Sequence, residues 1–365
     1  MERAWYYSFN WLMAAATIAL AAFGTVLIGS ADLHATVGAG EWHKQVIYIG
    51  LGIVAMAALA ALDYHRLQRW ARGLYLANFA LLGLVMIGGR SALGAQRWIN
   101  IGPIQFQPSE PAKLIVAIAT AAYLASVPRV GPREAITAIA MIGAPALLIL
   151  KQPDLGTTLV LFAILSAELF FGVARAWYFA VYAAAIGAIG AVVVGTNFVL
   201  KPFQRNRLLV FLHPHADPQG AGWNLAQSKI AVGSGELFGK GLYHGTQTQL
   251  DFVPEHSRDF IFTVVGEEFG FVGALALLAL YGVMLYGGIR AMYSARDRFG
   301  LYLSGGLIAM LAFHITINVG MTIGIMPITG IPLPFVSYGG TAILTDFAAV
   351  GMLLNIHVQR DRLVF

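Results

Sequence analysis

The stretch LMAAATIALAAFGTVLI at positions 12–28 contains no charged side chain and consists almost entirely of apolar and small residues. A helix of roughly 20 such residues crosses the roughly 30 Å hydrocarbon core of a membrane. The whole chain has the same character, since 58% of its 365 residues are hydrophobic and 11% are charged, against about a quarter charged in soluble domains. A water-soluble fold cannot bury so much apolar surface, so the sequence predicts an all-α, polytopic membrane protein.

Charge-poor stretches like this one recur along the chain, and we expect each of them to cross the membrane as a helix. The ten predicted spans are 12–28, 46–62, 74–87, 113–127, 136–150, 155–173, 177–199, 260–289, 301–325 and 342–356. No small-residue cleavage pattern follows the first span, so we expect it to stay in place rather than act as a removable signal peptide. Residues 1–365 are therefore predicted to form one transmembrane domain.

The positive charges predict the orientation of these helices. An even number of spans places both termini on one side, where the short connections are rich in arginine, as in HRLQRWAR from His65 to Arg72. Such loops are typical of the cytoplasmic side. We therefore expect both termini to be cytoplasmic and the long connection 200–259, between the seventh and eighth helices, to be extracytoplasmic.

The net charge of +5 is explained by arginine anchoring against anionic lipids. The chain has no basic tail that would favour nucleic acid, so we expect a membrane environment and no nucleic-acid partner. The absence of cysteine excludes disulfides and thiolate metal sites.

Polar residues outside the spans gather on the predicted extracytoplasmic side, in 88–113, 151–157, 201–259 and 327–340. Loops carry function more often than the elements they join, and a connection of about 60 residues inside a compact bundle is unusual unless it works or is disordered. Its segment WNLAQSKIAVGSGELFG predicts a short interfacial helix that ends at Gly233 and Gly235. We therefore expect any chemistry at this face.

Two of the candidate acids begin predicted helices. Glu110 and Lys113 are three residues apart and can pair on one helical face, either beside a substrate or only as a local ion pair. Asp154 lies at the start of the predicted span 155–173, where unsatisfied amides and the helix dipole favour a carboxylate, so capping alone would explain it.

Asp259 immediately precedes the apolar run FIFTVV and so lies at a membrane boundary. A helix cap is its simplest explanation. However, Glu255, His256 and Arg258 concentrate ionisable groups beside it, and burial and neighbouring charge perturb pKa values at functional sites. Asp259 is therefore a candidate catalytic acid or base.

Glu267 and Glu268 lie inside the predicted span 260–289. A charged side chain at the centre of a spanning helix costs about 2.5–3.5 kcal/mol on insertion scales. At least one of the two is therefore expected to face the bundle interior and to be paired or protonated.

The segment GSGELFGKG, Gly233 to Gly241, resembles a phosphate loop but lacks the glycine that a Walker sequence requires five residues before its Gly-Lys pair. A glycine-rich turn with Lys240 could still cradle a diphosphate through backbone amides. The alternative is a plain turn.

No nucleotide motif accompanies this polar face. An enzyme there needs a substrate that arrives through the membrane with its leaving group attached, and a lipid-linked diphosphate sugar meets that need. A transporter fits the same observations.

Several strings resemble one family along most of the chain: RWINIGPIQFQPSEPAK, KQPDLGTTLV, NLAQSKIAVGSGELFGKGLYHGTQTQLDFVPEHSRDFIFTVVGEEFG and GIPLPFVSYGGTAILTDFAAVGMLLNI. They are similar to the SEDS proteins, for shape, elongation, division and sporulation. The resemblance implies a ten-helix peptidoglycan glycosyltransferase of the bacterial inner membrane, with an extracytoplasmic active site. It would polymerise lipid II during cell elongation, alongside a class B penicillin-binding protein that crosslinks the strands.

The resemblance also assigns residues. The essential acid of the family's His-Thr-Asp-Phe motif matches Asp259, and the other matched positions are Glu110 and Lys113 of QPSEPAK, Asp154 of QPDLGT and Ser337 of PFVSYGG. Two positions depart from the family pattern, because Arg258 replaces a small hydroxyl residue and Glu236 replaces a glycine. Arg258 is expected to lower the pKa of Asp259 and so to weaken it as a base.

The resulting hypothesis is that Asp259 accepts a proton from a sugar hydroxyl that attacks the anomeric carbon of the lipid-linked glycan. Lys113, Arg97 or Lys240 would offset charge on the departing diphosphate. A divalent cation, Mg²⁺ or Mn²⁺, held by Asp259, Glu110 or Asp154 is the alternative. A lipid II flippase and a non-catalytic scaffold for the penicillin-binding protein remain competing functions.

Overall fold

The computed structural model describes residues 8–33, 40–88, 90–92, 95–101, 104–172, 177, 180, 182–184, 187, 202–213, 217, 220–250, 252–253 and 255–361. Its elements, in chain order, are α2 (Trp11–Ala31), α3 (Glu41–Ala61), α4 (Tyr64–Gly88), β1 (Arg90–Ala92), β2 (Ala95–Ile101), β3 (Ile104–Phe106), α5 (Ser109–Ser126), α6 (Pro132–Lys151), α7 (Leu155–Gly172), α9 (Pro202–Leu212), α10 (Ala221–Ser234), α11 (Thr246–Gln249), α12 (Ile261–Tyr293), α13 (Arg298–Ile323), α14 (Gly340–Val358) and η2 (Gln359–Asp361).

The helices confirm a mostly helical, multi-pass membrane architecture. Within the described residues, seven helices are long and apolar enough to span a membrane: α2, α3, α6, α7, α12, α13 and α14. Helices α4 and α5 cover two further predicted spans. The predicted span 177–199 falls largely outside the described residues, so the count of ten stays a prediction.

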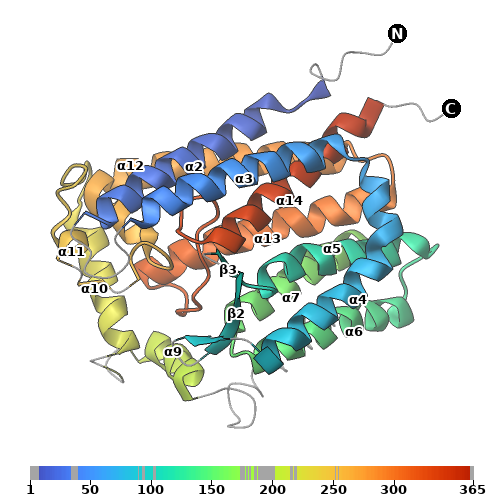
Figure 1. The fold of residues 1–365 in the computed structure, drawn as a ribbon, viewed down its shortest axis with the longest axis horizontal. Helices are drawn as coiled ribbons and strands as arrows, with labels where there is room; N and C mark the ends of the chain where they lie inside the picture. The colour runs from blue at the N-terminus through green and yellow to red at the C-terminus, as the bar shows by residue number, and fades with distance from the viewer. Residues whose placement is uncertain are drawn as a thin grey trace.

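The helices pack into one bundle, and both termini leave it at the same end (Figure 1). Helix α14 packs on α3, α12 packs on α2, and α13 packs on α5 and α7. The strands and α9, α10 and α11 lie away from the termini (Figure 1). The polar segments that are far apart in sequence therefore meet at one part of the bundle.

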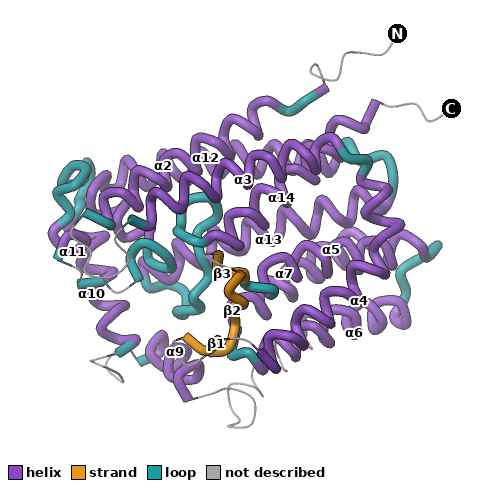
Figure 2. The backbone as a smooth tube through the Cα atoms, in the orientation of Figure 1, coloured by secondary structure: helices purple, strands orange, loops and turns teal. Residues whose placement is uncertain are grey.

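The segment 88–113 contains a small sheet that the all-α prediction missed. Strands β1, β2 and β3 form an antiparallel meander in which Ile99 pairs with Phe106 and Ile101 with Ile104. Figure 2 shows these strands in orange beside loop segments. The sheet matters because β2 carries Arg97 and Trp98 to the cavity described below.

The described residues of the predicted extracytoplasmic connection 200–259 contain three helices, α9, α10 and α11. The helix predicted from WNLAQSKIAVGSGELFG is confirmed as α10, which ends at Ser234 with Gly235 as its C-cap. Its interfacial position stays a prediction. The connection is therefore an ordered part of the bundle in its described residues.

The glycine-rich turn that follows α10, Gly235–Gly241, hydrogen-bonds to α12 where α12 is interrupted. Helix α12 has a non-helical residue at Gly270, with φ 65° and ψ −160°, so backbone groups on both sides lose their helical partners. A membrane-embedded helix needs replacements for them. Four hydrogen bonds supply these: Phe271 N to Glu236 O (2.9 Å), Val272 N to Leu237 O (3.0 Å), Lys240 N to Glu267 O (3.0 Å) and Gly241 N to Glu268 O (3.0 Å).

The side chains of Glu267 and Glu268 are both buried, as predicted. Glu267 accepts hydrogen bonds from Lys240 Nζ (2.8 Å) and from the amide of Thr248 (3.0 Å). Glu268 accepts one from the hydroxyl of Ser30 (2.6 Å). The two carboxylates thus fasten the turn and α11 to α12 and α2.

Candidate active site

A cavity of about 400 Å³ opens where the polar segments meet. Its walls come from the start of α3, from β2 and β3, from the first turns of α5 and α7, from α9 and α13, and from the segments 255–259, 330–332 and 338–342. Five of the seven predicted site residues line it, namely Arg97, Glu110, Lys113, Asp154 and Asp259. Sequence positions separated by more than half the chain are therefore brought into one site.

Asp259 faces this cavity rather than capping the helix that follows it. The N-cap of α12 is Phe260, and no side-chain hydrogen bond caps this helix end. A Cβ atom placed on Gly330 would lie 3.1 Å from Oδ2 of Asp259 and 3.3 Å from Nη1 of Arg207. The carboxylate and the guanidinium therefore both lie close to Gly330, where a larger side chain would crowd them.

The surroundings of Asp259 raise its pKa above the ordinary aspartate value. Burial is the largest cause, and the negative charge of Glu255 acts in the same direction. The positive charges of Arg207, Arg258 and Arg97 oppose this change and lower the pKa, but they do not cancel it. A carboxylate with a raised pKa binds a proton more tightly, which suits a general base.

Glu110 and Lys113 form a buried ion pair on the first turn of α5. The distance from Lys113 Nζ to Glu110 Oε2 is 2.8 Å, and Lys113 is only 2% exposed. Lys113 Nζ also lies 3.2 Å from Nε2 of His314 on α13. The charge of Lys113 therefore has a fixed position at the cavity wall.

Asp154 caps α7, as predicted, and also contacts Gln107 and Arg97. Its carboxylate accepts hydrogen bonds from the amide (3.1 Å) and the hydroxyl (2.9 Å) of Thr157 at the start of α7. It also accepts one from Gln107 Nε2 (3.2 Å) and lies 3.9 Å from Arg97 Nη1. Arg97 itself donates to the carbonyl oxygens of Gln152 (3.0 Å) and Pro153. Asp154 therefore holds the small sheet and Arg97 against α7.

Known proteins share the sequence and the fold of this chain. A family model described as "Cell cycle protein", for FtsW, RodA and SpoVE, matches residues 10–362. The chain belongs to the FtsW/RodA/SpoVE family. This family is the same as the SEDS proteins, which the sequence motifs of the chain resemble.

Among relatives of this family, peptidoglycan glycosyltransferase MrdB of Escherichia coli K12 is 37% identical over 347 residues, covering 95% of this chain and 92% of that protein. A chain from a peptidoglycan synthase complex that coordinates polymerization and crosslinking superposes with a TM-score of 0.81 at 31% identity, covering 97% of this chain and 99% of that chain. Rod shape determining protein RodA of Thermus thermophilus gives a TM-score of 0.70 at 28% identity, covering 97% and 98%.

Arg258, the first departure from the FtsW/RodA/SpoVE pattern, is held by two glutamates. Its Nη2 lies 2.9 Å from Glu41 Oε1 and its Nη1 lies 3.3 Å from Glu255 Oε2. Its guanidinium also lies over the ring of Tyr338, 5.5 Å from the centroid. Arg258 lowers the pKa of Asp259 as expected, but less than Arg207 does, and the pKa remains raised overall.

Two predicted site residues of this family member lie outside the cavity lining. Lys240 pairs with Glu267, at 2.8 Å, and the amides of its turn bind the carbonyls of α12, so the structure does not form the predicted diphosphate cradle. Ser337 donates from its hydroxyl to the carbonyl of Arg258 (2.6 Å) and accepts from the amide of Leu333 (2.8 Å). Ser337 therefore fixes the backbone next to Asp259 without lining the cavity.

Two of the three carboxylates predicted as possible metal ligands, Glu110 and Asp154, have protein partners. Within the described residues, no group of three or more His, Asp or Glu side chains is arranged to hold a metal. Glu110 is paired with Lys113, and the oxygens of Asp154 accept from Thr157 and Gln107. Of the three carboxylates, Asp259 is the one that we assign to contact the substrate.

Sequence reasoning missed four charged or titratable groups at the site: Glu41, Arg207, His314 and Asp346. Asp346 is buried on α14, where the charges of Lys113 and Glu110 both act on it. His314 and Asp346 fall inside the predicted spans 301–325 and 342–356, and an ionisable residue within a span is itself a functional signal. Glu41 and Arg207 carried no such signal, because their roles depend on how α3 and α9 dock.

Proposed function

We propose that this chain is a peptidoglycan glycosyltransferase that polymerises lipid II into glycan strands at the extracytoplasmic face of the bacterial inner membrane. The observation that carries the proposal is Asp259, a carboxylate with a raised pKa that faces a cavity lined by five Lys and Arg side chains and four other carboxylates. The names of the relatives support the same activity.

The proposed reaction needs one base and several positive charges. The carboxylate of Asp259 accepts the proton from a sugar hydroxyl, whose oxygen then attacks the anomeric carbon of a second lipid-linked sugar. The bond between that carbon and the diphosphate oxygen breaks, and the lipid diphosphate leaves with the bonding electrons. Lys113, Arg97 and Arg207 stand around the cavity to offset the charge that develops on the leaving group.

The cavity suits a lipid-borne substrate because it is formed by helix ends and membrane-boundary segments. A polar reacting centre can enter from the membrane surface while its lipid stays in the bilayer. The arginine-rich short loops support the orientation that places this cavity outside the cell.

We further propose that a class B penicillin-binding protein is the partner that crosslinks the product. The similar chain from a peptidoglycan synthase complex supports this assignment. The partner would receive glycan from the face at which the cavity opens.

Reconstitution with lipid II separates the competing functions. The purified chain in liposomes is given fluorescent lipid II, and both glycan polymer on a gel and transbilayer movement of the lipid are recorded, with and without the partner and a chelator. A glycosyltransferase makes polymer that grows with time. A flippase moves lipid II without polymer, and a scaffold does neither alone. No polymer under any of these conditions would contradict the proposal.

A further inference from the structure

The side chain of Asn318 joins two segments of the cavity. Asn318 lies on α13 and is fully buried. Its Nδ2 atom donates to the main-chain carbonyl of Asp259 (2.8 Å) and to that of Ile331 (2.8 Å). One carboxamide therefore uses both of its N–H groups on carbonyls that come from opposite sides of α13 in the sequence.

Both carbonyls belong to backbone that lacks regular secondary structure. Residues 255–260 form turns before α12, and residues 327–333 contain no helix or strand. Asp259 provides the reacting carboxylate, while Gly330, Ile331 and Pro332 line the cavity beside it. The position of the carboxylate relative to this wall thus depends on side chains that tie the two segments together.

The amide oxygen of Asn318 does not take part in this connection. Oδ1 of Asn318 is buried and has no hydrogen-bond partner among the described residues. A buried polar atom without a partner is unfavourable, so the position favours Asn for its two donors. The arrangement is a clamp made by N–H groups alone.

We propose that Asn318 is a positioning residue for Asp259, which holds the backbone of the base and the segment 330–332 in one fixed relation. This inference rests on the proposed function, because it assigns Asp259 as the base. Ser337 acts on the neighbouring carbonyl of Arg258 (2.6 Å). Consecutive peptide units before α12 are therefore both fixed by buried side chains.

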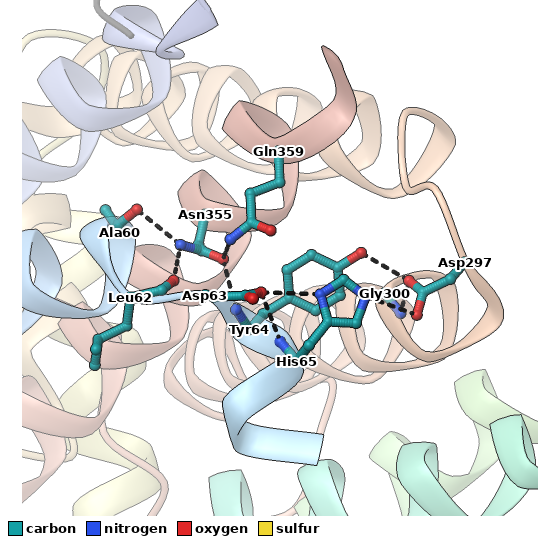
Figure 3. A network of polar contacts seen from close by, with 9 residues as sticks. All are labelled: Ala60, Leu62, Asp63, Tyr64, His65, Asp297, Gly300, Asn355 and Gln359. Atoms are coloured by element: carbon teal, nitrogen blue, oxygen red, sulfur yellow. Dashed lines mark hydrogen bonds and ion pairs between the residues drawn. The ribbon is translucent and has the colours of Figure 1, made fainter. Parts of the chain in front are cut away.

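The chain offers a matched control at the other end of the bundle. Asn355 on α14 also uses its Nδ2 atom to donate to two main-chain carbonyls, those of Ala60 (2.8 Å) and Leu62. Figure 3 shows this second clamp next to Tyr64 and Gln359, among residues that do not line the cavity. Loss of the Asn355 amide removes two donor bonds of the same kind without touching Asp259. It also removes the hydrogen bonds that Asn355 Oδ1 accepts from the amide of Tyr64 (3.1 Å) and from Gln359 Nε2 (2.9 Å), so this control loses at least as many contacts as Asn318→Leu.

The test compares Asn318→Leu and Asn355→Leu, which replace the amide by an apolar side chain of similar size. Both variants are expected to lose thermal stability. Asn318→Leu is expected to lower kcat for lipid II polymerisation by roughly 10-fold to 100-fold with KM nearly unchanged, because the base is displaced while substrate contacts remain. Asn355→Leu is expected to keep kcat within about twofold of the parent.

Two further variants keep the comparison decisive. In an Asp259→Asn background, Asn318→Leu is expected to add no further loss, because it acts through the base. Asn318→Ser, which retains one donor, is expected to give an intermediate kcat if Asn318→Leu fails to fold. Equal kcat losses in Asn318→Leu and Asn355→Leu, or a full additional loss in the Asp259→Asn background, would overturn the positioning role.

Hydrogen exchange provides a readout that does not need activity. Amide exchange in 255–262 is expected to quicken in Asn318→Leu and to stay at the parent rate in Asn355→Leu. Unchanged exchange in Asn318→Leu would contradict the clamp itself. A parent that makes no polymer while Asn318→Leu still loosens 255–262 would instead show that the proposed function is wrong and the clamp is real.

Discussion

The Nζ atom of Lys113 lies 2.8 Å from Oε2 of Glu110, and both side chains are buried at the wall of the cavity. Replacing Lys113 by Met leaves the carboxylate of Glu110 buried without its counter-charge. We expect this variant to lose about 3–5 kcal/mol of stability and most polymerisation activity. Thermal unfolding in detergent and a lipid II gel assay measure the two effects.

The double variant Glu110→Gln with Lys113→Met separates folding from function. It removes both charges, so much of the lost stability is expected to return. Polymerisation is expected to remain low, because the positive charge near the substrate is still missing. Near-parent polymer from the double variant would exclude both residues from the substrate site.

The pKa of Asp259 predicts how activity depends on pH. Only the ionised carboxylate accepts a proton, so the rate falls as pH drops through the pKa, which burial raises above the usual aspartate value. Glu255→Gln removes a charge that raises this pKa and is expected to move the acid limb of the kcat profile to lower pH. Arg207→Gln removes a charge that lowers it and is expected to move the limb to higher pH.

Shifts of the same sign in these two variants would contradict the assignment of the acid limb to Asp259. The profiles are best compared at saturating lipid II, since both side chains line the cavity and affect binding.

Glu236 occupies a conformation that glycine adopts at lower cost. Its φ of 48° lies in the left-handed region, at the position where the family pattern has glycine. We expect Glu236→Gly to stabilise the protein by about 0.5–1 kcal/mol, because relief of the left-handed strain exceeds the added freedom of the unfolded chain. Glu236→Ala retains the strain and serves as the control, so equal thermal stability of the two variants would contradict this account.

The orientation is tested with single cysteines, since the natural chain has none. Cysteines at Arg69 and Arg296 are expected to resist an impermeant maleimide on intact cells, whereas one at Trp223 is expected to react. Trp223 is 44% exposed, so accessibility does not limit its labelling. Labelling at 69 or 296 would reverse the orientation and move the cavity to the cytoplasmic side.

Much of the fold could be predicted from hydropathy, because a spanning helix must satisfy its backbone internally and therefore appears as a long apolar run. The sheet of β1, β2 and β3 is not evident in the sequence, because two of its strands have only three residues each and its polar residues resemble a loop. For the turn at Gly233 to Gly241 the sequence leaves a diphosphate cradle and a plain turn as alternatives, because the break of α12 at Gly270, where the turn supplies hydrogen bonds, is not visible in the sequence.

Only part of the site could be predicted from the sequence, and the reason is related. Asp259, Glu110 and Lys113 stand in local contexts that already suggest chemistry, and the structure places all three at one cavity. Arg207 and Asn318 act through contacts between segments that are distant in sequence. Such contacts depend on how helices dock, which a local pattern does not contain.

Asp259→Asn tests the central claim most directly, because the two explanations of this residue give opposite results. Asn is close to Asp in size and shape and still forms hydrogen bonds, so a purely structural role predicts near-parent activity. A general base cannot be replaced by an amide, and the account predicts a loss of about 10²-fold to 10⁴-fold in lipid II polymerisation, with a monodisperse, folded protein. Asp259→Asn protein that polymerises lipid II at the parent rate would contradict the assignment of Asp259 as the base.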